Sequence, residues 1–489
     1  RGPHIPQKMN KRRVSMRLLI SFLVLYCSSL VIAELECTYF SGTLRQQVGN
    51  EIQEETIHMC RLANGKQYKL PDEFFHQTSQ QSSDEFVSGL SLLQCIGVET
   101  NEEKNEIRVV SDEAVIHHLP SIDRSGLSSS RTRGERRILI VRVKSDRGSI
   151  EPSYTKERLG EVMFSESETV NSFAFQYEKC SNGQLRFVPG TVGESMAVPG
   201  VIDMVINENY EGLHFDRAME NRLNAIFEDK VAPLTSYDHV LFCLPRGMKN
   251  KFLAFAIKND NVSYYGDPWC GKLSGTMHEI GHNLGLAHSG EKGDLEYDDE
   301  TCTMGLGYNR FHGPKKCFNG QKLWYFDWFP EQKLLITTNM LPWSGSLGAF
   351  VDSDLDENLP VAIRVGNLYL AYNRKSKHNS GVEEKPDLVT VVEAHNPSAT
   401  SWLLAGLSAP PSRRGYSTTL QKTTLFDVEL LDITVEVCEI VNNNDSSIAD
   451  HAKLLIRRTS DQSSTCPQRV PSPSPTRNPT RNPTRNPTR

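Results

Sequence analysis

Apolar positions between residues 138 and 257 follow two different periods, and each period predicts a different element. Runs rich in Val, Ile, Leu and Phe, typical of buried strands, occupy 138–143, 200–206, 237–245 and 251–257. Residues 215–232 instead repeat apolar side chains every three or four positions, which predicts an amphipathic helix. Its apolar face consists of Phe215, Ala218, Met219, Leu223, Ile226 and Phe227. Strands that alternate with a helix predict a domain containing both α and β elements.

The pattern changes after residue 345, where no long helix is predicted. Short strand-like runs occupy 360–372, 387–394, 400–407, 433–441 and 452–458. Many short strands without helices favour a β-sandwich, so we expect a separate β-rich domain in this part of the chain.

The two ends of the chain have compositions unlike a folded core. Residues 9–33 have a basic start, an apolar run from Leu18 to Ile32 and small residues before Glu34. The run is shorter than the roughly 20 residues of a membrane span, so we predict a cleaved signal peptide, with an uncleaved anchor as the alternative. No other apolar run is long enough to span a membrane. The tail, 466–489, repeats Pro-Thr-Arg-Asn and is expected to stay extended and disordered.

Composition and cysteine usage narrow the class of protein. A chain of 489 residues exceeds what one core comfortably fills, and its net charge of −6 offers no basic footprint for nucleic acid. Of eleven cysteines, Cys27 lies in the signal peptide, which leaves an even number for disulfides in an exported protein. Three of these precede residue 137 and seven follow it, so each piece holds an odd count.

A polar, basic stretch directly precedes the first predicted strand at 138–143. Within it, Arg133 and Arg136 have the R-x-x-R spacing that processing proteases read. We therefore predict that residues 34–136 form a pro-region that is removed by cleavage between Arg133 and Ile138. A solvated interdomain linker is the alternative.

The segment "MHEIGHNLGLAHS" carries the strongest chemical signal in the chain. On a helix, His278 and His282 lie on one face, one turn apart, so both imidazoles can reach one ion. Gly285 permits a sharp turn after the helix, and His288 returns as a third ligand. Three nitrogens leave a fourth zinc position for water, whose proton Glu279 can accept. The pattern predicts one catalytic Zn²⁺.

A second motif, "EYDDETCTMGLGY", places Met304 sixteen residues beyond His288 in a glycine-flanked turn. With the long histidine motif, this pattern resembles the metzincin metallopeptidases, in which a methionine turn underlies the zinc. Within that clan the chain is similar to the gametolysin family, peptidase family M11, of algal wall-lytic peptidases. The similar blocks lie between about 137 and 410 and include "VNSFAFQYEKCSNGQLRFVP", "YDHVLFCLP", "HEIGHNLGLAHS", "CFNGQKLWYFDWF" and "VGNLYLAYNRKSKHNSG".

The resemblance implies an α+β metzincin-type catalytic domain over 137–340, with a twisted mixed sheet plus backing and active-site helices. From the patterns described above, we also expect an N-terminal pro-region and a β-rich C-terminal domain, here 341–465. The family's roles carry over to His278, His282 and His288 as zinc ligands and to Glu279 as base. Met304 is then the structural methionine.

Two further features leave alternatives open. A pro-region cysteine, Cys60 or Cys95, is a candidate for capping the zinc in a latent zymogen, but a disulfide is the stronger reading of each. The acidic run "DSDLDEN" at 352–358 is a candidate binding site for calcium as a second ion. The EF-hand pattern does not support it, because Glu357 and Ile363 stand where that loop needs glycine and glutamate.

We expect a secreted zinc endopeptidase acting on extracellular or cell-wall glycoproteins. The alternative is a peptidase-like matrix or wall-binding protein with little activity. Such a protein is expected to lose a ligand or the glutamate, and this chain retains all four residues.

Overall fold

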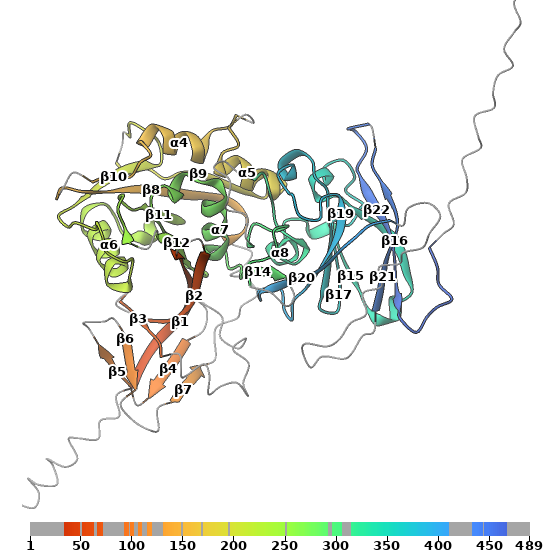
Figure 1. Ribbon diagram of the computed structural model, residues 1–489, viewed down its shortest axis with the longest axis horizontal. Helices are drawn as coiled ribbons and strands as arrows, with labels where there is room; N and C mark the ends of the chain where they lie inside the picture. The colour runs from red at the N-terminus through yellow and green to blue at the C-terminus, as the bar shows by residue number, and fades with distance from the viewer. Residues whose placement is uncertain are drawn as a thin grey trace, which may run out of the picture.

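Strands outnumber helices in the part of the chain that the computed structural model describes, and together they form a mixed α+β fold (Figure 1). The described residues are 34–48, 51–62, 66–71, 92–96, 98–101, 106–109, 115–119, 131–147, 150–167, 170–193, 196–249, 252–291, 296–305, 314–409, 433–443 and 445–466. The predicted signal peptide and residues 467–489 of the repeat tail lie outside them.

The largest sheet has the strand order β10-β8-β11-β13-β12-β1-β2-β3-β6-β5, with β9 paired to β8, β4 paired to β1, and β7 paired to β4. Strands β8, β9, β10, β11 and β13 run parallel, whereas β12 runs antiparallel to β13. The bounds are β1 (Glu34–Val48), β2 (Glu51–Arg61), β3 (Gln67–Lys69), β4 (Leu92–Ile96), β5 (Val98–Asn101), β6 (Glu106–Val109), β7 (Val115–Leu119), β8 (Gly134–Ser145), β9 (Leu185–Pro189), β10 (Val201–Ile206), β11 (His239–Cys243), β12 (Phe252–Ile257) and β13 (Val262–Tyr265).

The four apolar runs expected to be strands between 138 and 257 are β8, β10, β11 and β12, as predicted. Strand β8 reads as a continuous apolar run because both of its faces are covered. Ile138 and Ile140 pack into the core beneath helices α4, α5 and α7, while Leu139 and Val141 pack against α6 on the opposite face.

Side-chain caps begin most of the helices. The side chains of Thr155, Ser172, Asp216 and Asn319 each accept a hydrogen bond from a backbone N–H in the first turn. The predicted amphipathic helix is α6, which buries Met219, Leu223 and Phe227 as expected. The bounds are α4 (Lys156–Phe164), α5 (Phe173–Cys180), α6 (Arg217–Lys230), α7 (Leu273–Asn283) and α8 (Gly320–Phe326).

The residues after 345 form strands at every predicted run, and the larger of their two sheets also includes β14 and β15 from before residue 341. A six-stranded sheet has the order β14-β20-β19-β18-β17-β15, and a three-stranded sheet has the order β16-β22-β21. The bounds are β14 (Ser289–Glu291), β15 (Lys333–Ile336), β16 (Trp343–Gly348), β17 (Ala362–Val365), β18 (Leu368–Asn373), β19 (Leu388–Glu393), β20 (Ser401–Leu407), β21 (Ile433–Val441) and β22 (His451–Arg458). Because β14 follows the histidine motif directly, the six-stranded sheet begins beside these histidines. A single cluster of buried apolar residues extends from β8 to β22.

Four disulfides join described cysteines, as expected for an exported chain: Cys37–Cys60, Cys180–Cys317, Cys243–Cys270 and Cys438–Cys466. The odd counts on either side of residue 137 leave one free thiol in each piece, namely Cys95 and Cys302, and both are buried. None of the four bonds crosses that position.

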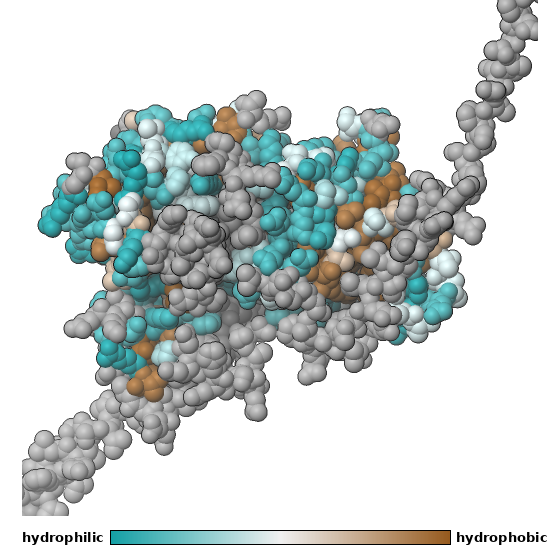
Figure 2. All heavy atoms as spheres, viewed as in Figure 1, coloured by the Kyte–Doolittle hydropathy of each residue, from teal (hydrophilic) through white to brown (hydrophobic). Residues whose placement is uncertain are grey.

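The visible surface is mostly hydrophilic over α4, β8 and α6, and larger apolar areas lie over the C-terminal strands (Figure 2). Among the residues described, no helix has both the length and the apolar character to cross a membrane.

Candidate metal centre

Helix α7 carries the first two histidines and is buried along nearly its whole length. It ends where Gly285 adopts a φ of +100°, a left-handed conformation that suits glycine. A Cβ at Gly285 would also collide with the hydroxyl of Tyr325. The backbone N–H of Asn259, just after β12, donates to the carbonyl of His282 at 2.9 Å. The turn and this bond fix where the chain leaves the helix.

The three histidines converge through their Nε2 atoms. His282 Nε2 lies 3.1 Å from His278 Nε2 and 3.0 Å from His288 Nε2. All three residues are at most 5% exposed. The spacing suits one ion, because nitrogens about 2.0–2.1 Å from a tetrahedral zinc lie roughly 3.3 Å apart. In the described part of the chain, this is the one group of His, Cys, Asp and Glu residues with such converging donor atoms.

The other ring nitrogens face acceptors that orient the rings. His278 Nδ1 lies 2.9 Å from the carbonyl oxygen of Thr303, and His282 Nδ1 lies 2.9 Å from that of Leu286. His288 Nδ1 lies 3.5 Å from a carboxylate oxygen of Glu296. A carbonyl accepts only from N–H, so Nδ1 carries the proton and Nε2 keeps its lone pair. That tautomer is the one a metal ligand needs, so the residues present fit a zinc ion.

Glu279 and Met304 lie next to this cluster. Glu279 follows His278 on α7 and is 1% exposed. Met304 is fully buried beneath the helix, where a Cβ at Gly281 would overlap its sulfur. Its carbonyl accepts from Ser289 N–H at 3.0 Å, which ties the methionine turn to the residue after His288.

A buried polar network that was not predicted from the sequence holds the third histidine in place. Asn319 Nδ2 donates to Ser289 Oγ at 2.8 Å, to Asp299 Oδ2 at 3.1 Å and to Ser401 Oγ at 3.0 Å. Lys322 Nζ donates to the carbonyl of His288 at 2.9 Å. The only sequence signal for this network was the "CFNGQKLWYFDWF" block, whose Asn-Gly pair begins α8.

The electrostatics of this network follow from its burial. Lys322 is fully buried, and loss of hydration lowers its pKa to about 7. An aromatic ring also covers the site, since the ring centroid of Tyr297 lies 4.1 Å from that of His288. Lys322 lies on α8, far from α7 in sequence, so local spacing could not have placed it there, whereas Tyr297 follows His288 by nine residues.

Neither candidate latency cysteine joins the histidines. Cys60 is bonded to Cys37, so its sulfur is not available as a thiolate. Cys95 lies in the small core of the N-terminal strands, where burial raises the pKa of its thiol to about 12. A protonated thiol is a poor metal ligand, and the structure therefore speaks against a cysteine cap from either residue.

The acidic run at 352–358 uses its carboxylates within the fold. Asp352 Oδ1 lies 2.8 Å from Lys377 Nζ, and Asp352 Oδ2 accepts from the N–H of Asp450 at 3.1 Å. Asp356 Oδ1 accepts from the N–H of Asn358 at 3.0 Å. These bonds fit the reading of an acidic loop rather than a calcium site.

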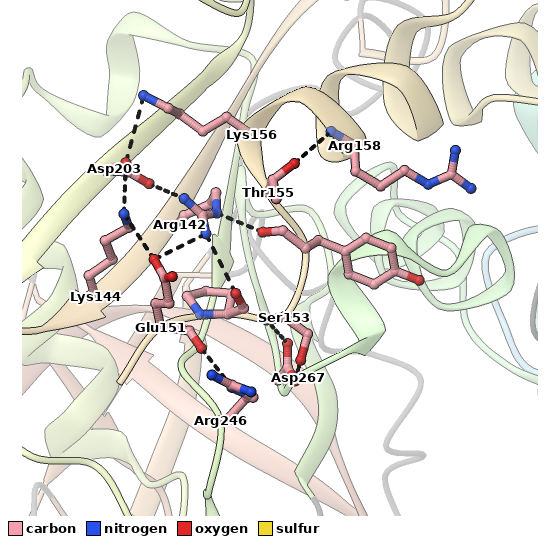
Figure 3. Close-up of polar contacts among 12 residues, drawn as sticks. Arg142, Lys144, Glu151, Ser153, Thr155, Lys156, Arg158, Asp203, Arg246 and Asp267 are labelled. Carbon is pink, nitrogen blue, oxygen red and sulfur yellow. Dashed lines mark hydrogen bonds and ion pairs between the residues drawn. The ribbon is translucent and has the colours of Figure 1, made fainter. Parts of the chain in front are cut away.

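A cluster of charged and polar residues connects the segment after β8 to the loop that precedes α7 (Figure 3). Arg142 on β8 is 5% exposed, bonds Asp203 Oδ1 at 2.5 Å and donates through Nε to the carbonyl of Tyr154 at 2.8 Å. Next to it, Ser153 N–H donates to Asp267 Oδ1 at 2.7 Å. Asp267 lies shortly before α7, so the segment after β8 is tied to the loop that leads into the histidine helix.

Comparison with known proteins agrees with this geometry. No curated protein matches the chain. Residues 137–331 match the family model described as gametolysin peptidase M11, a segment that contains the three histidines, Glu279 and Met304. The matched segment is therefore similar to the gametolysin-like peptidases of family M11, and it contains a buried three-histidine group that could hold a metal ion.

Proposed function

We propose that the protein is a secreted zinc endopeptidase that hydrolyses extracellular or cell-wall proteins and glycoproteins. The observation that carries the proposal is the convergence of three Nε2 atoms, with His282 Nε2 at 3.1 and 3.0 Å from the other two. Three neutral imidazoles hold a zinc ion and leave a position open for reactants. The peptidase family match supports the reaction class.

The residues of the chain divide the work of hydrolysis. A zinc ion bound there supplies Lewis acidity, which polarises the scissile carbonyl and makes water more acidic. Glu279 acts as the general base: its carboxylate accepts a proton from the attacking water and passes it to the amine nitrogen as the C–N bond breaks. The carbonyls of Thr303 and Leu286 hold two rings in the productive tautomer throughout.

We propose the following division of the chain: a signal peptide (9–33), a pro-region (34–136), a catalytic domain (137–340), a β-rich region (341–465) and the repeat tail (466–489). Arg133 lies 2.9 Å from Asp327, and residues from Gly134 onward pair with β9. Cleavage on the N-terminal side of Gly134 would disturb this pairing least. The four disulfides support export to an oxidising compartment.

The alternative is a wall- or matrix-binding protein that retains a peptidase fold but little activity. Two substitutions separate the alternatives. Glu279→Gln keeps the size of the side chain but removes the base, so the protein should keep its zinc while peptide hydrolysis falls by at least ~10²-fold. His282→Ala removes one of three ligands, so zinc content should fall together with activity.

The measurement is metal analysis beside a peptide assay on the purified, processed protein. Glu157→Gln, at an exposed position in the first turn of α4, is the matched control and should change neither readout. Near-normal turnover by Glu279→Gln, or one tightly held zinc in His282→Ala, would refute the assignment. Wild-type protein that binds zinc but cleaves no peptide would favour the binding-protein alternative.

A further inference from the structure

A cavity of about 510 Å³ lies beside helix α5, and the three histidines are not among the residues that line it. One wall is a single face of α5, continued by the residues just beyond each end of the helix. The other wall consists of Lys315 and of the short 3₁₀ helices Phe350–Asp352 and Lys377–Asn379 with the residues around them. A volume of this size falls within the range of roughly 300–1,000 Å³ that is typical of sites for small organic ligands.

Covalent and hydrogen bonds hold the two walls together. The disulfide Cys180–Cys317 joins the end of α5 to the segment that carries Lys315. Gln176, in the middle of α5, donates through Nε2 to the carbonyl of His378 at 2.7 Å. Figure 1 shows α5 on the side of the large sheet that faces the C-terminal region. The walls are therefore already in place before a ligand arrives, which lowers the free-energy cost of binding.

Three lysines line the cavity, namely Lys179, Lys315 and Lys377. Their charges act on His378, which lies in the wall between them. Burial and the three ammonium groups lower the pKa of this imidazole to about 4, and only the carboxylate of Asp354 opposes them. The neutral imidazole therefore reports a positive potential inside the cavity.

The two carboxylates that line the cavity each have a cation nearby. Glu178 Oε2 lies 3.6 Å from Arg186 Nε, and Asp354 Oδ1 lies 3.9 Å from Lys377 Nζ. Lys377 Nζ also lies 2.8 Å from Asp352 Oδ1. With these neighbours included, four cations stand against three carboxylates, so the cavity favours an anion.

Buried polar atoms in the walls have no hydrogen-bond partner among the described residues. They are Oδ1 and Nδ2 of Asn171 and Nε2 of His378. Since buried polar groups are normally paired, unmet groups beside a cavity indicate a polar ligand. An amide both donates and accepts, as a sugar hydroxyl does.

We propose that this cavity binds an acidic sugar unit, sulfated or carboxylated, at the end of a glycan. The lysines attract its anionic group, while Asn171, Asn182 and Ser353 offer amides and a hydroxyl to its hydroxyl groups and Phe175 offers an apolar face. An extended peptide fits less well, because it pairs with a strand edge, and this lining comes from a helix, turns and loops. Binding there needs neither zinc nor hydrolysis, so it stands apart from the proposed function.

The test uses the full-length Glu279→Gln chain, so that the outcome does not depend on peptide hydrolysis. Calorimetric titrations compare lactose sulfated on its galactose, digalacturonate, plain lactose, inorganic sulfate and an acidic hexapeptide. We expect at least one of the two acidic disaccharides to bind at least tenfold more tightly than each of the other three. Equal binding of lactose would show that the lysines play no part. Equal binding of sulfate would leave a site for small anions only, and tighter binding of the hexapeptide would indicate a peptide site; each of these results overturns the proposal.

Two substitutions at exposed positions of the cavity test its location. Lys179→Gln removes a positive charge and Asn182→Asp adds a negative one, and the double variant should bind the acidic disaccharide at least tenfold more weakly. Lys249→Gln, exposed after β11 and outside the cavity, is the matched control and should stay within twofold. Unchanged affinity of the double variant would overturn the assignment.

Amide hydrogen exchange locates the bound sugar without any substitution in the cavity. The acidic disaccharide should slow exchange in 173–183 and 377–382, and protection confined to other segments overturns the proposal. The same disaccharide linked through its reducing end to a carrier protein should still bind. Loss of binding on linkage would restrict the site to free saccharides and overturn its assignment to a glycan.

Discussion

The contact between Gly281 and Met304 offers a quantitative test of how the methionine turn supports the histidine helix. A Cβ at Gly281 would overlap Met304 Sδ, approach Met304 Cε to 3.3 Å and lie 3.6 Å from Leu286 Cδ1. Gly281 directly precedes His282 on α7, so a shift of the helix backbone there moves a ligand. The perturbation is Gly281→Ala, alone and combined with Met304→Ala.

The magnitudes follow from two opposing effects. Alanine gains about 1 kcal/mol over glycine inside a helix, but overpacking a rigid core costs about 1–3 kcal/mol. Gly281→Ala should therefore lower the free energy of unfolding by up to about 2 kcal/mol. Met304→Ala should lower it by about 2–5 kcal/mol, because it leaves a cavity. In the double variant the new methyl group enters the vacated space, so the coupling energy should favour the pair by about 1–3 kcal/mol.

The assay is denaturant unfolding of all four proteins with a chelator present, so that zinc affinity does not enter the free energies. Gly275→Ala, on the same helix, is the matched control, because the nearest neighbours of its added Cβ belong to Trp269. It should combine additively with Met304→Ala. If Gly281→Ala and Met304→Ala were also additive within about 0.5 kcal/mol, the reasoning from their contact would be refuted.

Two further predictions concern stability. Arg142→Met removes the donor to Asp203 and to the carbonyl of Tyr154, while Lys144 still lies 3.1 Å from Asp203, so the free energy of unfolding should fall by roughly 1–3 kcal/mol in urea titrations, and an unchanged urea midpoint would contradict this. Burial lowers the pKa of His239 to about 4, whereas an unfolded histidine titrates near 6.5. The unfolded state therefore binds more protons between these pH values. This contribution is complete above pH 6.5 and is lost as the pH falls towards 4, by about 3 kcal/mol. His239→Phe should remove this loss of stability at low pH when the free energies of unfolding of both proteins are measured with a chelator present. Parallel pH profiles of these free energies for the two proteins would contradict the prediction.

Local spacing was enough to predict the group of three histidines that could hold a metal ion. The four-residue interval between His278 and His282 places both rings on one helix face, and Gly285 has the left-handed conformation that the motif requires. Strands β8, β10, β11 and β12 and helix α6 were also predicted from local spacing. The spacing of apolar residues indicates whether a strand or a helix would bury them on one face.

Elements with a weak local signal were missed. Helices α4 and α5 are only two to three turns long, so their apolar patterns are short. The caps at Thr155 and Ser172 alone give too little local signal to predict them. The pairing of β14 with β20 was not predicted, because β14 is only three residues long and carries too little pattern. Such short elements exist because tertiary contacts stabilise them, not because of their own sequence.

The sequence by itself determined the three-histidine motif and the alternation of strands and helices, because these depend on residues that are close together in the chain. Only the tertiary structure decided which groups surround the ligands and which segments line the cavity beside α5. The carbonyl of Thr303 on His278, Lys322 beneath His288 and Gln176 against His378 each bring together residues far apart in the chain. Such pairs are set by strand order and register, which arise from the packing of the whole core and leave no periodic signal in the sequence.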